Sequence, residues 1–235
     1  MNDKTTKKIH PVEGIKVSSV SSGMYKKTRL DLSIIEINPN ASVAGVFTNN
    51  KAKSPAVIIS QQNLKKSNPQ FLIVNAGNAN AGTGKDGYND AVKYCQSLAN
   101  KANCSIDEIL VFSTGVIGEK IKAKNIIDSI PALLNNLSSN KWSEFSHSIL
   151  TTDTVNKIIS KKFKIAGESI TITGVTKGSG MIMPNMATML SFVATNIKIP
   201  KKTLSKILKD ITNLSFNMIT VDGDTSTNDS SILIA

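Results

Sequence analysis

The chain has 235 residues, of which 40% are hydrophobic and 19% are charged, so it can bury the core of one large domain or two small ones. Its formal net charge of +11 suggests a nucleic-acid partner, but only Arg29 is an arginine and the lysines are scattered, so a solvated lysine-rich surface is favoured instead. No segment has the roughly 18 consecutive apolar residues of a membrane span, and the first residues lack the apolar stretch of a secretory signal, so we predict a cytoplasmic protein without membrane contact.

Strands and helices are predicted to alternate along the chain. Short β-branched or apolar runs indicate strands, and apolar residues at helical spacing indicate helices. A turn at 38–40 joins the first two strands, and the lysine-containing segment 160–168 is predicted to form a hairpin. The predicted strands are 31–37, 43–48, 56–60, 71–75 and 109–112, and the predicted helices are 88–102, 122–137 and 201–216.

The sequence ends inside an apolar segment, 230–235, that has the composition of a buried strand. No polar tail follows it, and we expect no helix to cover it. Domains rarely stop in this way, because an uncovered strand edge promotes association. We therefore expect the chain to be incomplete at its C-terminus.

Several familiar binding motifs are absent. The glycine-rich segment 77–85 lacks a phosphate-loop pattern, and 222–233 lacks the glycine and glutamate of a calcium loop, so a tight turn held by Asp and Thr side chains is favoured there. The two cysteines have no partners at zinc-binding spacing, and the two histidines have no nucleophile beside them in the sequence. We expect no metal site and no histidine-based triad.

Two threonines are candidates for acyl-transfer chemistry. If the Ala187-Thr188 peptide bond were cut, Thr188 would carry a hydroxyl nucleophile and an α-amine base in one residue; the alternative is an ordinary buried position. Thr114 and Gly115 follow the strand 109–112, where a hydroxyl and a backbone N–H can point at one oxyanion, although a plain capped turn would have the same sequence.

The chain resembles the ornithine acetyltransferase family, the bifunctional glutamate N-acetyltransferases of arginine biosynthesis. The resemblance covers nearly the whole length, and its last two blocks are long and specific. It rests on GVFTNN at 45–50, VNAGNANAGTG at 74–84, STGVIGE at 113–119, TTDT at 151–154, KGSGMIMPNMATMLSFVATN at 177–196 and SFNMITVDGDTSTND at 215–229.

The resemblance implies an α+β fold, a layered α/β-type sandwich of the DmpA/ArgJ type, with β-sheets flanked by helices and an N-terminal nucleophile. It implies self-cleavage at Ala187-Thr188 into an α chain, 1–187, and a β chain that starts with 188–235, assembled as two α and two β chains. It makes Thr188 the nucleophile, places Thr114 and Gly115 in the oxyanion hole, and places Thr151 and Lys177 against the substrate.

The implied reaction moves an acetyl group from N-acetylornithine to glutamate through an acetyl-Thr188 ester, without a cofactor in the chemical step. Whether acetyl-CoA is also a donor stays open. The family commonly has Ser and Cys where this chain has Ala76 and Gly82, and family members run to about 400 residues, so pocket residues from their later half have no counterpart here. The alternatives are an inactive remnant of such an enzyme and a related N-terminal-nucleophile amidase or aminopeptidase.

Overall fold

The computed structural model describes residues 8–183 and 189–235 and arranges them in two β-sheets and five α-helices. One sheet has the strand order β1-β2-β4-β5 and the other has the order β3-β9-β8-β7-β6. The strands are β1 Ile15–Val20, β2 Leu32–Ile37, β3 Val43–Phe47, β4 Phe71–Asn78, β5 Ile109–Val116, β6 Lys157–Ile165, β7 Glu168–Lys177, β8 Leu190–Thr195 and β9 Ser230–Ile234.

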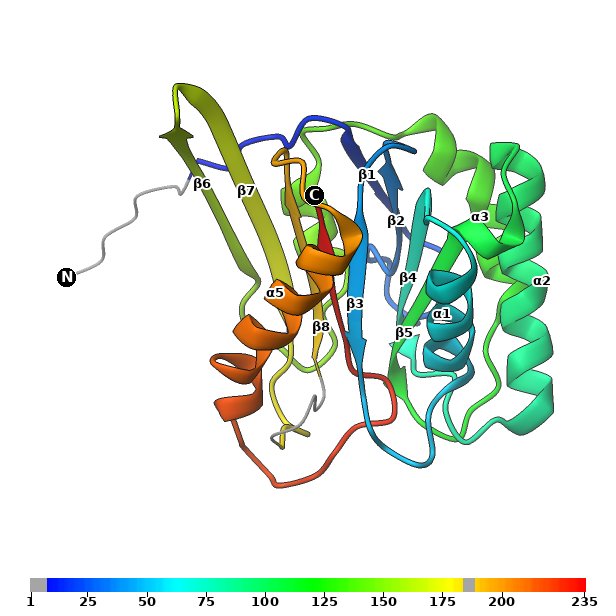
Figure 1. The fold of residues 1–235 in the computed structure, drawn as a ribbon. Coiled ribbons are helices and arrows are strands. Elements are labelled where there is room, and N and C mark those ends of the chain that lie inside the picture. Colours follow the sequence, from blue (N-terminus) through cyan, green and yellow to red (C-terminus); the bar gives the residue numbers. More distant parts are fainter. Residues whose placement is uncertain (1–7, 184–188) are drawn as a thin grey trace.

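Helices α1, α2, α3 and α5 flank the two sheets on their outer sides, so the molecule has a helix–sheet–sheet–helix order (Figure 1), whereas α4 packs into the core between the sheets. Helices α1, α2 and α3 cover the four-stranded sheet, and α5 covers β3 and β9 of the other sheet. The α-helices are α1 Pro55–Lys66, α2 Gly84–Ala102, α3 Ala123–Asn135, α4 Trp142–Ser148 and α5 Lys201–Asn213, with short 3-10 helices at Ile106–Glu108 and Phe216–Met218. The predicted α+β class, with sheets flanked by helices, is confirmed.

The main core lies between the two sheets. Phe112 of β5 and Phe192 of β8 meet edge to face with ring centroids 5.1 Å apart, and Phe145 of α4 packs on Phe192 at 5.4 Å. A second core packs the outer face of the four-stranded sheet against α1, α2 and α3, and a third packs Leu204 and Leu208 of α5 against Leu233. Strands buried on both faces explain the continuous apolar runs in the sequence.

The segment 56–60 was predicted to be a strand, and this prediction is wrong, because it forms the first half of α1. Its β-branched residues favour a strand locally. However, Ser54 caps the helix, since its Oγ accepts a hydrogen bond from Val57 N at 3.4 Å, and Pro55 occupies the first turn, where no N–H donor is needed. The Ser-Pro start signal and the polar residues after Ser60 outweigh the strand propensity.

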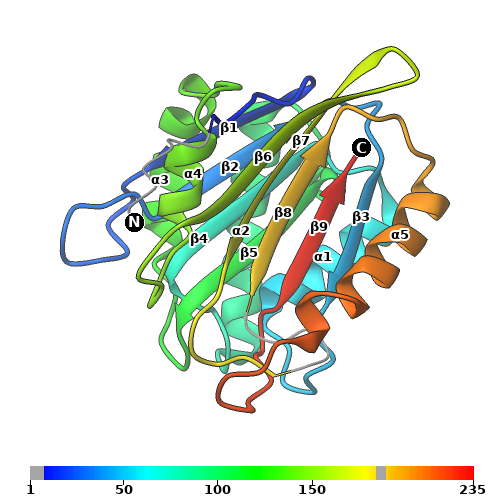
Figure 2. The ribbon, with the colours of Figure 1, turned by 90° about the vertical axis from the view of Figure 1, so that its left-hand side faces the viewer.

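The last strand is not an uncovered edge. In Figure 2, β9 lies between β8 and β3, pairing in parallel with β8 and antiparallel with β3. The expectation that no helix covers this segment is also wrong, because Leu233 packs against α5. The hairpin expected near 160–168 is confirmed, with β6 and β7 joined through Ala166 and Gly167 in left-handed conformations.

The other predicted elements are confirmed with shifted ends. The predicted helix 88–102 begins earlier, at Gly84, and the predicted helix 201–216 ends at Asn213. The strands on either side of the turn at 38–40 belong to different sheets, so the chain crosses there from one layer to the other. None of the helices in the described ranges has the length and hydropathy that a membrane span requires.

Candidate active site

A cavity of about 450 Å³ opens where the ends of several strands meet. β4 and β5 are parallel neighbours, so their carboxyl ends lie at the same edge of the sheet. The end of β7 and the loop before β9 approach this edge from the other sheet. The residues that line the cavity are Tyr25, Gly77, Ala79, Thr114, Gly115, Val116, Ile117, Thr151, Thr152, Lys177, Ser179, Gly180, Met181, Ser226, Thr227 and Asn228.

Four residues that the sequence singled out come together in this cavity: Thr114, Gly115, Thr151 and Lys177. They come from the end of β5, the segment after α4, and the end of β7, and are separated by as many as 63 positions in the sequence. The remaining two predicted residues, Ala187 and Thr188, lie outside the described residues. The structure therefore brings together every predicted site residue that it describes.

The turn at Thr114 and Gly115 depends on a close approach between two backbones. Gly115 has φ of +133°, and a Cβ atom there would lie 2.3 Å from the carbonyl carbon of Gly77. Only glycine allows both this dihedral angle and this contact. The close approach puts the end of β5 directly beside the end of β4 at the cavity wall.

Lys177 is almost completely buried, with 4% of its surface exposed. Its Nζ donates a hydrogen bond to Thr151 Oγ1 at 3.2 Å, which joins the two residues predicted to contact substrate. Burial lowers the pKa of Lys177 to about 8, although the carboxylates of Asp153 and Asp229 act in the opposite direction. The ammonium group can therefore change its charge near neutral pH.

Asp153 holds the segment that follows Lys177. Its Oδ1 accepts hydrogen bonds from Lys157 Nζ at 2.7 Å and from Gly178 N at 2.8 Å. Burial raises the pKa of Asp153, but these hydrogen bonds and the nearby lysines outweigh that effect and lower the pKa below its usual value. The carboxylate thus stays ionised beside the cavity.

Asp229 fixes the backbone at the start of β8 by a hydrogen bond. Its Oδ1 accepts a hydrogen bond from the backbone N–H of Met189 at 2.7 Å, and Met189 directly follows Thr188 in the sequence. The next residue, Leu190, is the β-sheet partner of Lys177. On the upstream side, Ile182 N donates to Asp222 Oδ1 at 2.9 Å. Carboxylates from the segment that precedes β9 thus accept hydrogen bonds from the backbone at Ile182 and at Met189.

Asn228 links the two sheets at the cavity. Its Nδ2 donates to the carbonyl oxygens of Ala79 at 2.7 Å and Ser113 at 2.8 Å. The Ser113 carbonyl belongs to the same peptide unit as the Thr114 N–H, so this bond helps to set the orientation of the turn.

The sequence interpretation did not single out Asp153, Asn228 or Asp229. A signal for them was present, because each lies in a block that carries the family resemblance, TTDT or TSTND. The second block was interpreted only as a turn, and Asp222 does form one by accepting a hydrogen bond from Asp224 N at 3.0 Å. Within the described ranges, no group of three or more His, Cys, Asp or Glu residues could hold a metal ion.

The chain as a whole is similar to proteins of a known family. The model of the ArgJ family matches residues 16–235. The arginine biosynthesis bifunctional protein ArgJ of Psychrobacter arcticus is 47% identical over 227 residues, which are 97% of this chain and 56% of that protein. The chain therefore spans about half the length of the curated relative that it matches.

Two solved structures are also similar. The arginine biosynthesis bifunctional protein ArgJ of Bacillus halodurans is 34% identical, with a TM-score of 0.67 over 75% of this chain and 92% of that one. The ornithine acetyltransferase of Mycobacterium tuberculosis, solved with ornithine, is 28% identical, with a TM-score of 0.66 over 74% of this chain and 92% of that one. At 11% identity and a TM-score of 0.53, the L-aminopeptidase D-Ala-esterase/amidase of Ochrobactrum anthropi, described as a variant of the Ntn hydrolase fold, shares the fold alone over 98% of this chain and 75% of that one.

Proposed function

Because this chain belongs to the ArgJ family, we propose that the cavity is the acetyl-transfer site of a glutamate N-acetyltransferase that uses N-acetylornithine as donor. The observation that carries the proposal is the convergence of Thr114, Gly115, Thr151 and Lys177 on one cavity. The proposed setting is arginine biosynthesis in the cytoplasm.

In the proposed reaction, the chain first cuts its own Ala187-Thr188 bond, with water as the acceptor, which leaves a carboxylate on Ala187 and a free α-amine on Thr188. The freed α-amine of Thr188 accepts the proton of its hydroxyl, whose oxygen attacks the acetyl carbonyl of N-acetylornithine. The Thr114 hydroxyl and the Gly115 N–H stabilise the resulting oxyanion. The C–N bond then breaks, the ornithine amine leaves with the proton, and an acetyl-Thr188 ester remains.

The second half of the reaction reverses the first with a different amine. Glutamate attacks the ester through its α-amine, the ester C–O bond breaks, and Thr188 regains its proton. The Lys177 ammonium and the Thr151 hydroxyl, 3.2 Å apart, are suited to pair with a carboxylate of either substrate. If acetyl-CoA is a second donor, its acetyl group would form the same acetyl-Thr188 ester.

The lengths of the solved relatives support the cleavage proposal. The part of this chain that matches the Bacillus halodurans protein is 75% of 235 residues and makes up 92% of that chain, so that chain has about 190 residues. The α chain proposed here, 1–187, has nearly the same length. An assembly of two α and two β chains is part of the proposal.

The test is an acetyl-transfer assay on the purified 235-residue chain with N-acetylornithine and glutamate. We expect ornithine release to depend on glutamate and N-acetylglutamate to appear in equal amounts. Ornithine release without glutamate, with acetate as the other product, would indicate an amidase with water as acceptor. Failure to release ornithine, together with failure to form an acetyl-enzyme, would indicate an inactive remnant.

A further inference from the structure

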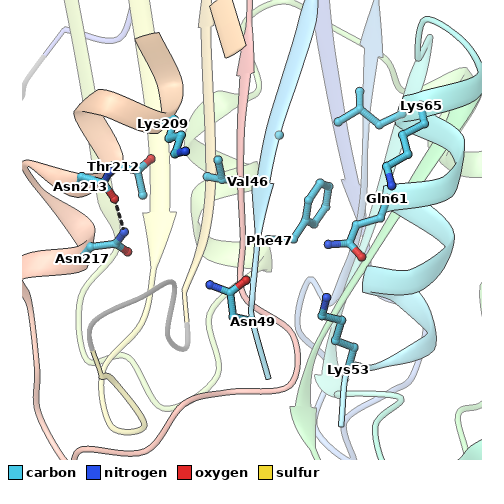
Figure 3. Close-up of a pocket in the computed structure, with 12 residues that line it drawn as sticks. Val46, Phe47, Asn49, Lys53, Gln61, Lys65, Lys209, Thr212, Asn213 and Asn217 are labelled. Carbon is cyan, nitrogen blue, oxygen red and sulfur yellow. Dashed lines mark hydrogen bonds between the residues drawn. The ribbon is translucent and has the colours of Figure 1, made fainter. Parts of the chain in front are cut away.

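A second concave surface lies between α1 and α5, over β3, and shares no lining residue with the active-site cavity. It encloses about 690 Å³, a size that suits a small organic molecule. Figure 3 shows α5 on one side of this groove, α1 on the other, and Val46 and Phe47 of β3 between them.

Three lysines face the groove, and no acidic residue lines it in the described structure. These are Lys53, before α1, Lys65, in its last turn, and Lys209 of α5. In Figure 3 the ammonium groups of Lys53 and Lys65 point toward Gln61 from opposite sides, and that of Lys209 points across toward Val46. Two acidic residues that pair with lysines of α5 and α1 are not among the lining residues: Asp210 binds Lys206, and Asp107 binds Lys66.

None of these three lysines makes a hydrogen bond or ion pair with the described residues, although six other lysines of the chain do form ion pairs. Three like charges around one hollow repel one another, and an anion would relieve that repulsion. Amide groups at Gln61, Asn49 and Asn213 add neutral hydrogen-bonding partners around the same space.

The groove also contains a buried polar atom that needs a partner. Thr212 lines the groove and is 2% exposed, yet its Oγ1 has no hydrogen-bond partner among the described residues. A buried hydroxyl without a partner is unfavourable by roughly 1–3 kcal/mol, so a group bound beside Thr212 that supplied a partner would be stabilised.

The middle of the groove is apolar. Successive side chains of β3 alternate between its faces, so the half-buried Phe47 ring lies with Leu64 on the α1 side and Val46 lies on the α5 side. Cations beside an aromatic ring are suited to a ligand that has both phosphate groups and an apolar or aromatic body. We propose that this groove binds a phosphorylated organic molecule, with its phosphates on Lys53, Lys65 and Lys209 and its body on Phe47. The proposal does not depend on acetyl transfer.

The test is calorimetric titration of the 235-residue chain with ADP and, separately, with inorganic pyrophosphate. We expect saturable binding of one ADP per chain, tighter than that of pyrophosphate because only ADP can contact Phe47. The Lys53→Ala/Lys209→Ala variant should bind ADP roughly tenfold more weakly or worse, since two charge-assisted contacts are lost.

The matched control is Lys162→Ala/Lys164→Ala, which removes the same charge from the exposed strand β6. In the sheet order, β6 is four strands from β3, about 19 Å away. This control should bind ADP within twofold of the unmodified chain. Equal losses in both variants, or no saturable ADP binding at millimolar concentration, would overturn the proposal. Pyrophosphate that binds as tightly as ADP would overturn the assignment of an organic ligand.

A measurement on the unmodified chain covers the case in which a variant fails to fold. Reductive methylation followed by peptide mass spectrometry should show that ADP protects Lys53, Lys65 and Lys209 but leaves Lys162 and Lys164 reactive. Uniform reactivity in the presence of ADP would contradict the site. Tighter binding of a random DNA duplex than of ADP, with a steep salt dependence, would instead identify a nucleic-acid surface.

Discussion

Lys177 and Thr151 meet at the wall of the cavity, with Lys177 Nζ 3.2 Å from Thr151 Oγ1. The two residues are 26 positions apart in the sequence, and the β6–β7 hairpin lies between them. Because β6 and β7 run antiparallel, the end of β7 lies beside the segment that precedes β6. The buried ammonium group of Lys177 and the hydroxyl of Thr151 therefore lie on the same side of the cavity.

Lys177 is expected to make the free energy of unfolding change with pH in the alkaline range. Its pKa is about 8 in the folded chain because of burial, against a usual value of 10.5, so between these two pH values the unfolded chain binds more protons. Stability should therefore rise with pH across this window, relative to Lys177→Met, by up to roughly 3 kcal/mol. Urea unfolding of both proteins at several pH values measures this difference. Curves that stay parallel from pH 8 to pH 10.5 would contradict the lowered pKa.

Gly115 and Gly118 form a matched pair for testing the turn. Both have positive φ, but a Cβ at Gly115 would meet the Gly77 backbone at 2.3 Å, whereas a Cβ at Gly118 meets no described atom within 4 Å. Gly118→Ala should cost about 1–2 kcal/mol of unfolding free energy, and Gly115→Ala more than about 3 kcal/mol. Thermal denaturation of the two variants compares them directly; equal melting temperatures would disprove the close approach.

Asn228 should stabilise the junction of the two sheets. Asn228→Leu leaves the carbonyl oxygens of Ala79 and Ser113 without this donor, at a cost of about 2–5 kcal/mol. Asn40→Leu, on an exposed turn, is the control and should change stability by less than about 0.5 kcal/mol. Denaturant unfolding distinguishes the two, and a loss as small as the control's would show that the bridge contributes little.

Thr114→Ala tests the proposed oxyanion hole. Loss of one donor to the oxyanion should raise the barrier to acetyl transfer by roughly 2.7–4 kcal/mol, while the fold is retained. Thr195→Ala, on β8 outside the cavity, serves as the control. The rate of ornithine release from N-acetylornithine is the measurement. If both variants keep the unmodified rate, the hydroxyl of Thr114 takes no part in the reaction.

Much of the fold could be predicted from local patterns, because strands buried on both faces and amphipathic helices have distinct sequence periods. The error at 56–60 arose because Val57, Ile58 and Ile59 favour a strand, while the helix is decided by Ser54 and Pro55 before them. The crossing of the chain between the two sheets after β2 could not be predicted, since a turn sequence does not specify which strand will be the partner.

The candidate site was predicted in part. Thr114 and Gly115 were candidates from the local sequence, Thr151 and Lys177 were named from the family resemblance, and all four line one cavity. The roles of Asp153, Asn228 and Asp229 could not be derived from the sequence, because each depends on a backbone group that tertiary structure brings to it: Gly178 N, Ser113 O and Met189 N, respectively. The role of Thr188 remains a prediction.

The most direct test of the central claim is the intact mass of the purified chain. Self-cleavage predicts two fragments, 1–187 and 188–235, and the shorter one should gain the mass of a single acetyl group after incubation with N-acetylornithine. Thr188→Ala should remain one chain of 235 residues and should gain no acetyl group. Cleavage of that variant at the same bond, or an acetyl group mapped to a residue other than Thr188 in the unmodified protein, would contradict the account.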